Sequence, residues 1–264
     1  MEFDGRAAFV TGGGSGIGRA IGLALALRGA FVWVTDFDAA SAAGTVDLIA
    51  SAGGRAEAVQ LDVRSESNWQ GALRQCDSSD DPLTILVNCA GKAASTDTFS
   101  MPVESFRDIM AINAEGTFLG MKHGIPRVAA AGGGAVVNIS SLAGLRGIAG
   151  MTAYCGSKGA IRMMTKAVAL ECAGLGNGVR VNSVHPGVVD TPAWRAALED
   201  LAAGGSEASG WRPIVPEERA RARVPIGVAC TPDEVADTVC FLASDAARHI
   251  TGAEIAIDGG MTAG

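Results

Sequence analysis

Short apolar runs that alternate with longer alanine-rich segments are the strongest constraint on how this chain can fold. Several runs, among them AAFV, FVWV and ILV, are apolar throughout, which is typical of strands buried on both faces of a sheet. Strands that alternate with helices form a parallel sheet joined by right-handed crossovers. The pattern predicts a doubly wound α/β fold with strands at 6–11, 31–35, 56–61, 84–88, 135–140, 180–184 and Glu254–Ile257.

The helices of this fold are expected near 16–28, 39–52, 67–76, 103–130, 153–173 and 232–243. The last of them has a clear start, because Thr231 can cap the helix and Pro232 suits its first turn. No linker or repeat divides the 264 residues, so we expect one domain, 1–264. The segment from about 190 to 225 breaks the alternation and is long for a connection, which predicts a lid or a substrate-binding element.

Composition narrows the class of protein. With 48% hydrophobic and 19% charged residues the chain is typical of a globular domain, and its net charge of −7 argues against a nucleic-acid partner. The N-terminal residues lack a basic stretch followed by an apolar one, and no run of 18 apolar residues occurs. We therefore expect a cytoplasmic protein without membrane contact. The six cysteines show no zinc-ligand spacing, so no metal is expected.

A glycine-rich turn, TGGGSGIG, joins the first expected strand to the first helix. Residues without a Cβ allow a tight turn and a close approach of backbone to a ligand, and the helix N-terminus presents unpaired N–H groups to an anion. This context predicts a dinucleotide pyrophosphate site. The contacts are expected from Gly12, Ser15, Gly16, Ile17 and Gly18.

Asp36, at the end of the second strand, indicates which dinucleotide binds. A carboxylate there accepts hydrogen bonds from both ribose hydroxyls and repels a 2′-phosphate. Phe37 follows it, where a basic residue would have favoured NADP. NAD is therefore the expected cofactor, and NADP stays open because Arg19 is a nearby cation that could reach a phosphate.

Two further strand ends belong to the same expected cleft, since such sheets bind ligands at the carboxyl ends of their strands. Asp62, followed by Val63, can bond an adenine amino group at the end of the third strand. The small residues after the fourth strand let the chain pass close to a ribose, and the residues expected there are Asn88, Ala90 and Gly91.

Tyr154 is the only tyrosine of the chain, and Lys158 follows it at the spacing of one helical turn. A phenol has a pKa of about 10, and a nearby positive charge favours the phenolate. Such a group could accept the proton of an alcohol as hydride leaves carbon, or donate it in the reverse direction. Ser141 would hydrogen-bond the substrate oxygen, so the three residues predict interconversion of an alcohol and a ketone.

Six motifs, TGGGSGIG, NCAG, NISS, YCGSK, HPGVVDT and IDGG, resemble those of the short-chain dehydrogenase/reductase family, in order and across essentially the whole chain. The resemblance implies a seven-stranded Rossmann fold and a homotetramer. It also implies a catalytic tetrad in which Asn113 joins Ser141, Tyr154 and Lys158. In the family this asparagine kinks its helix and holds a water that links the lysine to solvent.

The resemblance further implies cofactor contacts from Tyr154 and Lys158 and around the Pro-Gly turn, at Pro186, Gly187, Val189 and Thr191. Two residues depart from the usual motifs, Cys89 in NCAG and His185 before the turn. We expect His185 to pack at the strand end rather than to face the nicotinamide. Cys155, next to Tyr154, is expected to point away from the site because neighbouring helix residues diverge by about 100°.

The substrate is the least determined feature. By family position the pocket is bordered by Ser141, Tyr154, Ala93, Leu142, Ile148, Gly187, Trp194 and Trp211. Most of these are apolar, which favours a neutral cyclic, aryl or steroid-like molecule. An anionic tail is the alternative, with Arg146, Arg195 and Arg212 as its candidate partners.

Two other functions compete with this interpretation. One is a 3-oxoacyl-[acyl-carrier-protein] reductase, although that class is usually NADP-linked and has a shorter segment after the Pro-Gly turn. The other is a nucleotide-binding regulator without chemistry. The presence of all four tetrad residues argues against the second.

Overall fold

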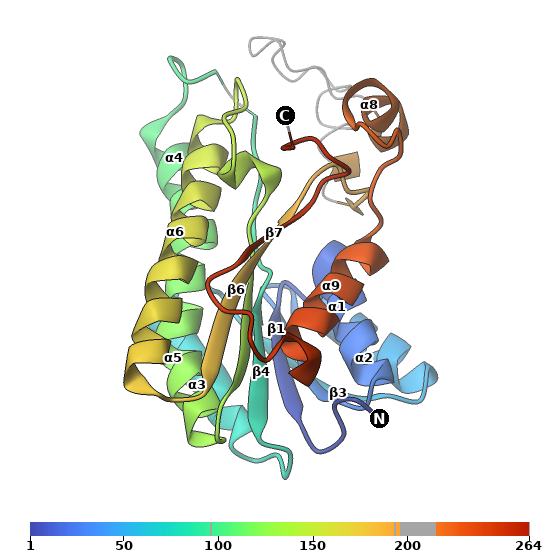
Figure 1. Cartoon of the computed structure of the whole chain (residues 1–264), viewed down its shortest axis with the longest axis vertical. Coiled ribbons are helices and arrows are strands. Elements are labelled where there is room, and N and C mark those ends of the chain that lie inside the picture. The colour runs from blue at the N-terminus through green and yellow to red at the C-terminus, as the bar shows by residue number, and fades with distance from the viewer. Residues whose placement is uncertain (96, 193, 196–214, 264) are drawn as a thin grey trace.

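A single parallel sheet forms the centre of the molecule (Figure 1). The structure, a computed structural model, describes residues 1–95, 97–192, 194–195 and 215–263. Within these residues the strand order is β3-β2-β1-β4-β5-β6-β7 and every pairing is parallel. The strands are β1 Ala7–Thr11, β2 Phe31–Asp36, β3 Arg55–Gln60, β4 Leu83–Asn88, β5 Gly134–Ile139, β6 Val179–Pro186 and β7 Glu254–Ile257.

Helices cover both faces of the sheet (Figure 1). Helices α1, α2 and α9 lie on one side; α3, α5 and α6 lie on the other, with α4 packed against α6. Their bounds are α1 Gly16–Leu27, α2 Ala39–Ser51, α3 Glu66–Cys76, α4 Val103–Met110, α5 Gly116–Ala130, α6 Thr152–Leu175, α8 Pro216–Arg223 and α9 Pro232–Ala243. This is the doubly wound, seven-stranded fold that the alternation predicts.

The continuous apolar runs have the expected physical cause. In β1, Ala8 and Val10 enter the core beneath α1 and α9, whereas Ala7 and Phe9 enter the core beneath α3 and α5. Because successive strand residues point to opposite faces, a strand covered on both sides must be apolar at every position.

The expected strand and helix ends agree with the observed ones to within a few residues. The helical segment predicted over 103–130 has those bounds, and a π-helical turn, Ala111–Glu115, divides it into α4 and α5 at Asn113, where the resemblance implied a kink. In the described part of the segment 190–225, α8 forms a helix that the sequence did not predict. Residues 196–214, including Trp211 and Arg212, lie outside the described residues.

The start of α9 confirms the predicted cap. The hydroxyl of Thr231 accepts a hydrogen bond from the Glu234 N–H at 3.2 Å, and the Glu234 carboxylate accepts one from the Thr231 N–H at 2.7 Å. This reciprocal pair satisfies two amides that the helix itself leaves unpaired.

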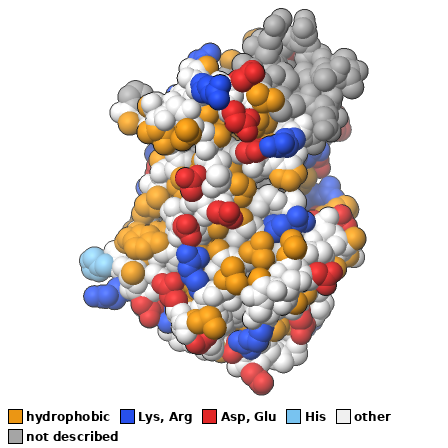
Figure 2. Space-filling view, turned by 90° about the vertical axis from the view of Figure 1, so that its right-hand side faces the viewer, with side chains coloured by type: hydrophobic (Ala, Val, Ile, Leu, Met, Phe, Trp, Pro, Cys, Tyr) orange, Lys and Arg blue, Asp and Glu red, His pale blue; other side chains and the backbone are white. Residues whose placement is uncertain are grey.

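The distribution of surface charge and the apolar character of the helices indicate which kinds of partner this chain could contact. On the face shown in Figure 2, basic and acidic side chains are interspersed over the described residues. In the described part of the chain, no helix combines the length and the apolar character needed to cross a bilayer.

Candidate active site

A large cleft of about 1490 Å³ opens at the carboxyl ends of the strands. It brings together nearly all of the predicted site residues, from turns that follow five different strands. Those that line it are Gly12, Ser15, Gly16, Ile17, Gly18, Asp36, Asp62, Val63, Ala90, Gly91, Ala93, Ser141, Leu142, Ile148, Tyr154, Lys158, Pro186, Gly187, Val189, Thr191 and Trp194. Asn88 and Asn113 do not line it.

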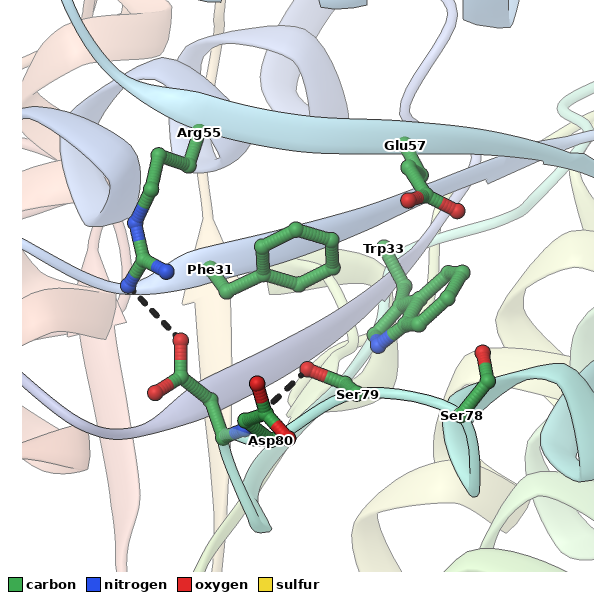
Figure 3. A pocket seen from close by; sticks show the side chains of 8 residues that line it. Phe31, Trp33, Arg55, Glu57, Ser78, Ser79 and Asp80 are labelled. Atoms are coloured by element: carbon green, nitrogen blue, oxygen red, sulfur yellow. Dashed lines mark hydrogen bonds and ion pairs between the residues drawn. The ribbon is translucent and has the colours of Figure 1, made fainter.

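A second hollow, of about 220 Å³, lies at the opposite end of the sheet (Figure 3). Phe31 and Arg55, the first residues of β2 and β3, border it, and the Arg55 guanidinium pairs with Asp81 at 2.7 Å. It contains none of the predicted catalytic or cofactor residues. The large cleft is therefore the candidate active site.

The glycine turn is built for close backbone approach. Gly12 has a φ of +65°, and a Cβ on it would lie 2.9 Å from the Cα of Ala90. A Cβ on Gly18 would collide with the carbonyl oxygen of Gly12. Thr11, which the sequence analysis missed, accepts hydrogen bonds at 3.0 Å from the N–H groups of Cys89 and Ala90 and so joins the two turns. The absence of Cβ atoms keeps the turn compact, and the N-terminus of α1 behind it presents unpaired N–H groups that suit a pyrophosphate.

Asp36 is held in place at the edge of the cleft. Its Oδ2 accepts from the Gly14 N–H at 2.9 Å, and its Oδ1 accepts from the Asp38 N–H at 3.0 Å. Arg19, the cation that kept NADP open, does not line the cleft. Its Nε donates to the Thr45 hydroxyl at 3.1 Å and its guanidinium also bonds the Gly14 carbonyl.

Arg64 is a second basic group in the cleft, one that the sequence analysis overlooked. Its guanidinium lies 5.8 Å from the ring centroid of Phe37 and forms ion pairs with Asp62 at 2.8 Å and Asp108 at 3.3 Å. The guanidinium holds the pKa of Asp62 below its usual range. Two carboxylates therefore already balance this cation, and nothing in the spacing of the sequence singles it out.

The side chain of Asn88 belongs to the core, so any contact of this residue with the cofactor would come from its backbone. Its Nδ2 donates to the Asn138 Oδ1 at 2.8 Å, and the Asn138 Nδ2 donates to the Thr165 hydroxyl at 2.9 Å. A Cβ on Gly120 would collide with the Asn88 Oδ1, so the amide faces α5. The alternation of a strand sends this side chain away from the cleft, and it ties β4, β5 and α6 together.

Ser141, Tyr154 and Lys158 converge in the cleft. Ser141 caps a short 3₁₀ turn, Leu142–Gly144, by accepting from the Ala143 N–H at 3.1 Å, and its side chain is hydrogen-bonded to Tyr154. The Lys158 Nζ donates to the Ile139 carbonyl at 2.9 Å and lies 5.7 Å from the Tyr154 ring centroid. One strand end and one helix face thus place a hydroxyl, a phenol and an amine together.

Burial dominates the protonation of these groups. It raises the pKa of Tyr154, although the hydrogen bond from Ser141 opposes the shift. It also lowers the pKa of Lys158 to about 8. The direction of the Tyr154 shift is opposite to the one expected from the Lys158 ammonium, because loss of hydration is its largest cause. Without further positive charge, Tyr154 is a protonated phenol at neutral pH.

Asn113 lies behind the cleft, in the π-helical turn. Its Oδ1 accepts from the Lys92 N–H at 2.8 Å, and its Nδ2 donates to the Lys92 carbonyl at 2.9 Å and to the Ser157 hydroxyl at 2.9 Å. A Cβ on Gly91 would lie 3.3 Å from both the Asn113 Oδ1 and the Lys158 Nζ. The buried amide thus interrupts the helix, holds the strand end beneath it and stands close to Lys158.

His185 and Cys89, which depart from the usual motifs, and Cys155, which follows Tyr154, differ in whether they line the cleft. His185 is fully buried, as predicted, and does not line the cleft. Cys89 does line it, and burial raises its thiol pKa to about 12, so it is neutral. Cys155 is absent from the lining, which agrees with the expected direction of its side chain.

The end of the cleft beside Ser141 is apolar. Leu142, Ile148 and Trp194 pack in a cluster with Val188, Val224 and Met261. Part of this wall comes from α8, which the sequence analysis did not predict. The lining residues that no motif indicated include Met261 and two arginines of α8, Arg219 and Arg223.

The arginines proposed for an anionic tail are placed differently from one another. Arg195 pairs with Asp190 at 2.8 Å between Nε and Oδ1. Arg146 lines the cleft and donates to the Met261 carbonyl at 2.9 Å. Arg219, which the sequence analysis did not propose, also lines it, with its guanidinium 5.4 Å from the Trp194 ring centroid.

Comparison with known proteins decides the family. A family model described as Enoyl-(Acyl carrier protein) reductase matches residues 12–262. The chain belongs to the short-chain dehydrogenase/reductase family. This short-chain protein is accordingly an oxidoreductase of the alcohol dehydrogenase and ketone reductase type.

Two curated relatives and one solved structure illustrate the similarity. The cyclohexanol dehydrogenase of Acinetobacter sp. is 36% identical, over 99% of this chain and 96% of its own. The NADP-dependent (R)-specific alcohol dehydrogenase of Lentilactobacillus kefiri is 35% identical, over 98% and 97%. A short-chain type dehydrogenase/reductase from Mycobacterium marinum superposes with a TM-score of 0.88 at 30% identity, covering 100% of this chain and 98% of that one.

Proposed function

We propose that this short-chain oxidoreductase interconverts a secondary alcohol and a ketone on a hydrophobic, cyclic, aryl or steroid-like molecule, with NAD as its cofactor. The observation that carries the proposal is the convergence of Tyr154, Ser141 and Lys158 in the cleft that also contains Asp36. When a phenol and a serine hydroxyl lie this close together, both can hydrogen-bond the oxygen of the same substrate alcohol. An isolated nucleotide-binding site has no need of that pair, which argues against a silent regulator.

In the proposed mechanism, the Ser141 hydroxyl hydrogen-bonds the substrate oxygen and Tyr154 removes its proton. A bound nicotinamide would supply the hydride acceptor, and its positive charge would oppose the burial that raises the pKa of Tyr154. Lys158, whose Nζ lies beside the Tyr154 ring, would hold the nicotinamide ribose. Asn113, in the π-helical turn close to Lys158, would fix the backbone around the amine through its bond to Ser157.

The apolar wall beside Ser141 supports a hydrophobic substrate. Leu142, Ile148 and Trp194 offer carbon surface rather than charge, which suits a ring or an aryl group. The name of the Acinetobacter relative, a cyclohexanol dehydrogenase, points to the same class. An acyl chain on a carrier protein is the second candidate, supported by the description of the matching family model.

The experiment that tests this function is a screen of secondary alcohols with NAD across pH 7–10. Because burial keeps Tyr154 protonated, the fraction of phenolate rises about tenfold per pH unit below its pKa. Oxidation should therefore accelerate as pH rises, whereas ketone reduction, which uses the protonated phenol, should stay nearly constant below that pKa. Above about pH 8, neutralisation of Lys158 reduces its pull on the phenolate and flattens the curve.

An alcohol deuterated at the carbinol carbon serves as the control for the pH screen. A primary isotope effect shows that hydride transfer limits the rate. A flat pH profile in the presence of that isotope effect would rule out the phenol as the base.

Asp36→Asn tests the choice of cofactor. The amide keeps the shape of the side chain and can still accept from the Gly14 N–H, but it no longer repels a 2′-phosphate. We expect the ratio of kcat/KM for NADP to that for NAD to rise at least tenfold, equivalent to about 1.4 kcal/mol. Initial rates with each cofactor measure it.

Asp38→Asn is the matched control for this change, because Asp38 lies two residues away and caps α2 by accepting from the Ala40 N–H at 3.0 Å. It should leave the ratio unchanged. Wild-type protein that prefers NADP, as its Lentilactobacillus relative is named for doing, would contradict the assignment of NAD.

We also propose a homotetramer located in the cytoplasm. Large apolar side chains are exposed on neighbouring helices of one side, namely Phe106 of α4, Phe118 of α5, and Met163 and Leu170 of α6. Exposed apolar area of this kind is typical of a face that contacts another subunit.

A further inference from the structure

His185 is a buried group whose hydrogen bonds the proposed mechanism does not use. It is the next-to-last residue of β6, directly before Pro186 and Gly187 in the cleft wall, and it is 0% exposed. Its Nδ1 lies 3.0 Å from the carbonyl oxygen of Ser141, and its Nε2 lies 2.9 Å from the hydroxyl of Ser183. Burial of an imidazole is costly unless its ring nitrogens are hydrogen-bonded, and here both have a partner.

The chemistry of the two partners determines the tautomer. Burial lowers the pKa of His185, so the ring is neutral at pH 7 and carries a single N–H. A carbonyl oxygen can only accept, so the proton must be on Nδ1. The Ser183 hydroxyl then donates to Nε2. The Nδ1–H of His185, in β6, donates to the carbonyl oxygen of Ser141, just after the end of β5.

This bond ties the Ser141 turn to the sheet. The Ser141 carbonyl also accepts from the Gly144 N–H at 2.8 Å, but Gly144 belongs to the same short turn and moves with it. The last backbone bond between β5 and β6 is one residue earlier, from the Ser140 N–H to the Val184 carbonyl at 2.8 Å. Beyond that point, His185 connects the peptide of Ser141 to a neighbouring strand.

We propose that His185 is a positioning residue that orients Ser141 through the Nδ1–H bond to its carbonyl, an inference that rests on the proposed function. The orientation matters because the Ser141 hydroxyl and carbonyl share one residue, so rotation of the peptide displaces the hydroxyl from Tyr154. A displacement of about 1 Å at a reacting group can cost about 100-fold in rate. Pro186 and Gly187 follow His185 directly and line the cleft. The position of the Ser141 turn is therefore coupled to the position of the cleft wall that faces the cofactor.

Three substitutions separate positioning from packing. In asparagine, the Nδ2 occupies the place of the imidazole Nδ1, so His185→Asn keeps the donor to Ser141. In glutamine, the amide reaches the place of Nε2, so His185→Gln keeps the contact with Ser183 alone. His185→Leu fills a similar volume without a donor, and the Ser183 hydroxyl can then turn its proton to the Ala253 carbonyl, 3.3 Å away.

The kinetic readout is kcat for the alcohol against KM for NAD. We expect His185→Leu and His185→Gln to lower kcat at least tenfold while KM for NAD stays within about threefold, and His185→Asn to restore kcat to within about threefold. A general loss of packing would instead raise KM for NAD, because Pro186 and Gly187 follow directly. Unchanged kcat in the leucine variant, or equal rescue by glutamine and asparagine, would overturn the inference.

A second readout does not depend on turnover. Amide hydrogen exchange over residues 141–145 should be faster in His185→Leu than in wild type and near wild type in His185→Asn. Equal exchange in all variants would overturn the inference even if kcat changed. If the wild-type protein oxidises no alcohol, the proposed function fails, and the exchange rates alone still decide whether His185 holds the turn.

Discussion

Tyr154→Phe should lower kcat for alcohol oxidation by about 10²- to 10⁴-fold, the range that a general acid–base group contributes. The ring stays in its buried place, and only the hydroxyl that meets Ser141 is lost. Packing and the shape of the cofactor cleft should therefore be preserved. Steady-state rates with the best alcohol of the screen measure the effect.

Binding and stability controls make this result specific. NADH affinity, measured by fluorescence, should stay within severalfold, and the thermal midpoint should change little. Cys155→Ala, one residue further along α6 and outside the cleft lining, should leave kcat within about twofold. Turnover by the phenylalanine variant at the wild-type rate would remove Tyr154 from the proposed chemistry.

Gly18→Ala should weaken cofactor binding at least tenfold and lower the free energy of unfolding by about 1–3 kcal/mol, the usual cost of overpacking. Its new Cβ would collide with the carbonyl oxygen of Gly12 and lie 2.7 Å from the carbonyl carbon. Both contacts are backbone, so the turn itself must move. Titration with NADH and urea unfolding measure the two effects.

Gly44→Ala is the matched control within a helix. A Cβ on Gly44 meets nothing within 4 Å, and alanine favours the helical state of α2. We expect unchanged cofactor affinity and a gain of about 0.5–1 kcal/mol in unfolding free energy. Equal behaviour of the two variants would show that the Gly18 turn does not need its close approach.

The sequence predicted much of the molecule because the relevant signals are local. Buried strands need continuous apolar runs, the cap at Thr231 needs only its own first turn, and the spacing of Tyr154 and Lys158 places them on one helix face. The motif positions likewise follow from strand ends, which meet at one edge of a parallel sheet. For these features, the chain within about ten residues carries the necessary information.

What the sequence did not predict concerns contacts between distant segments. Asn88 bonds Asn138 on the neighbouring strand, Arg19 bonds Thr45, and α8 supplies part of the apolar wall. In the π-helical turn within 103–130, Asn113 bonds the backbone of Lys92, 21 positions away. Such partners leave no periodic trace in the sequence.

The same division applies to Tyr154 and its neighbours. The sequence by itself determined the fold, the family and the order of Ser141, Tyr154 and Lys158 along the chain. Only the tertiary structure decided that burial, and not the lysine charge, sets the direction of the phenol pKa, and that His185 reaches the Ser141 carbonyl. The physical reason is that hydration and hydrogen-bond direction depend on what surrounds a group in space, and the sheet brings those surroundings together from strands far apart in sequence.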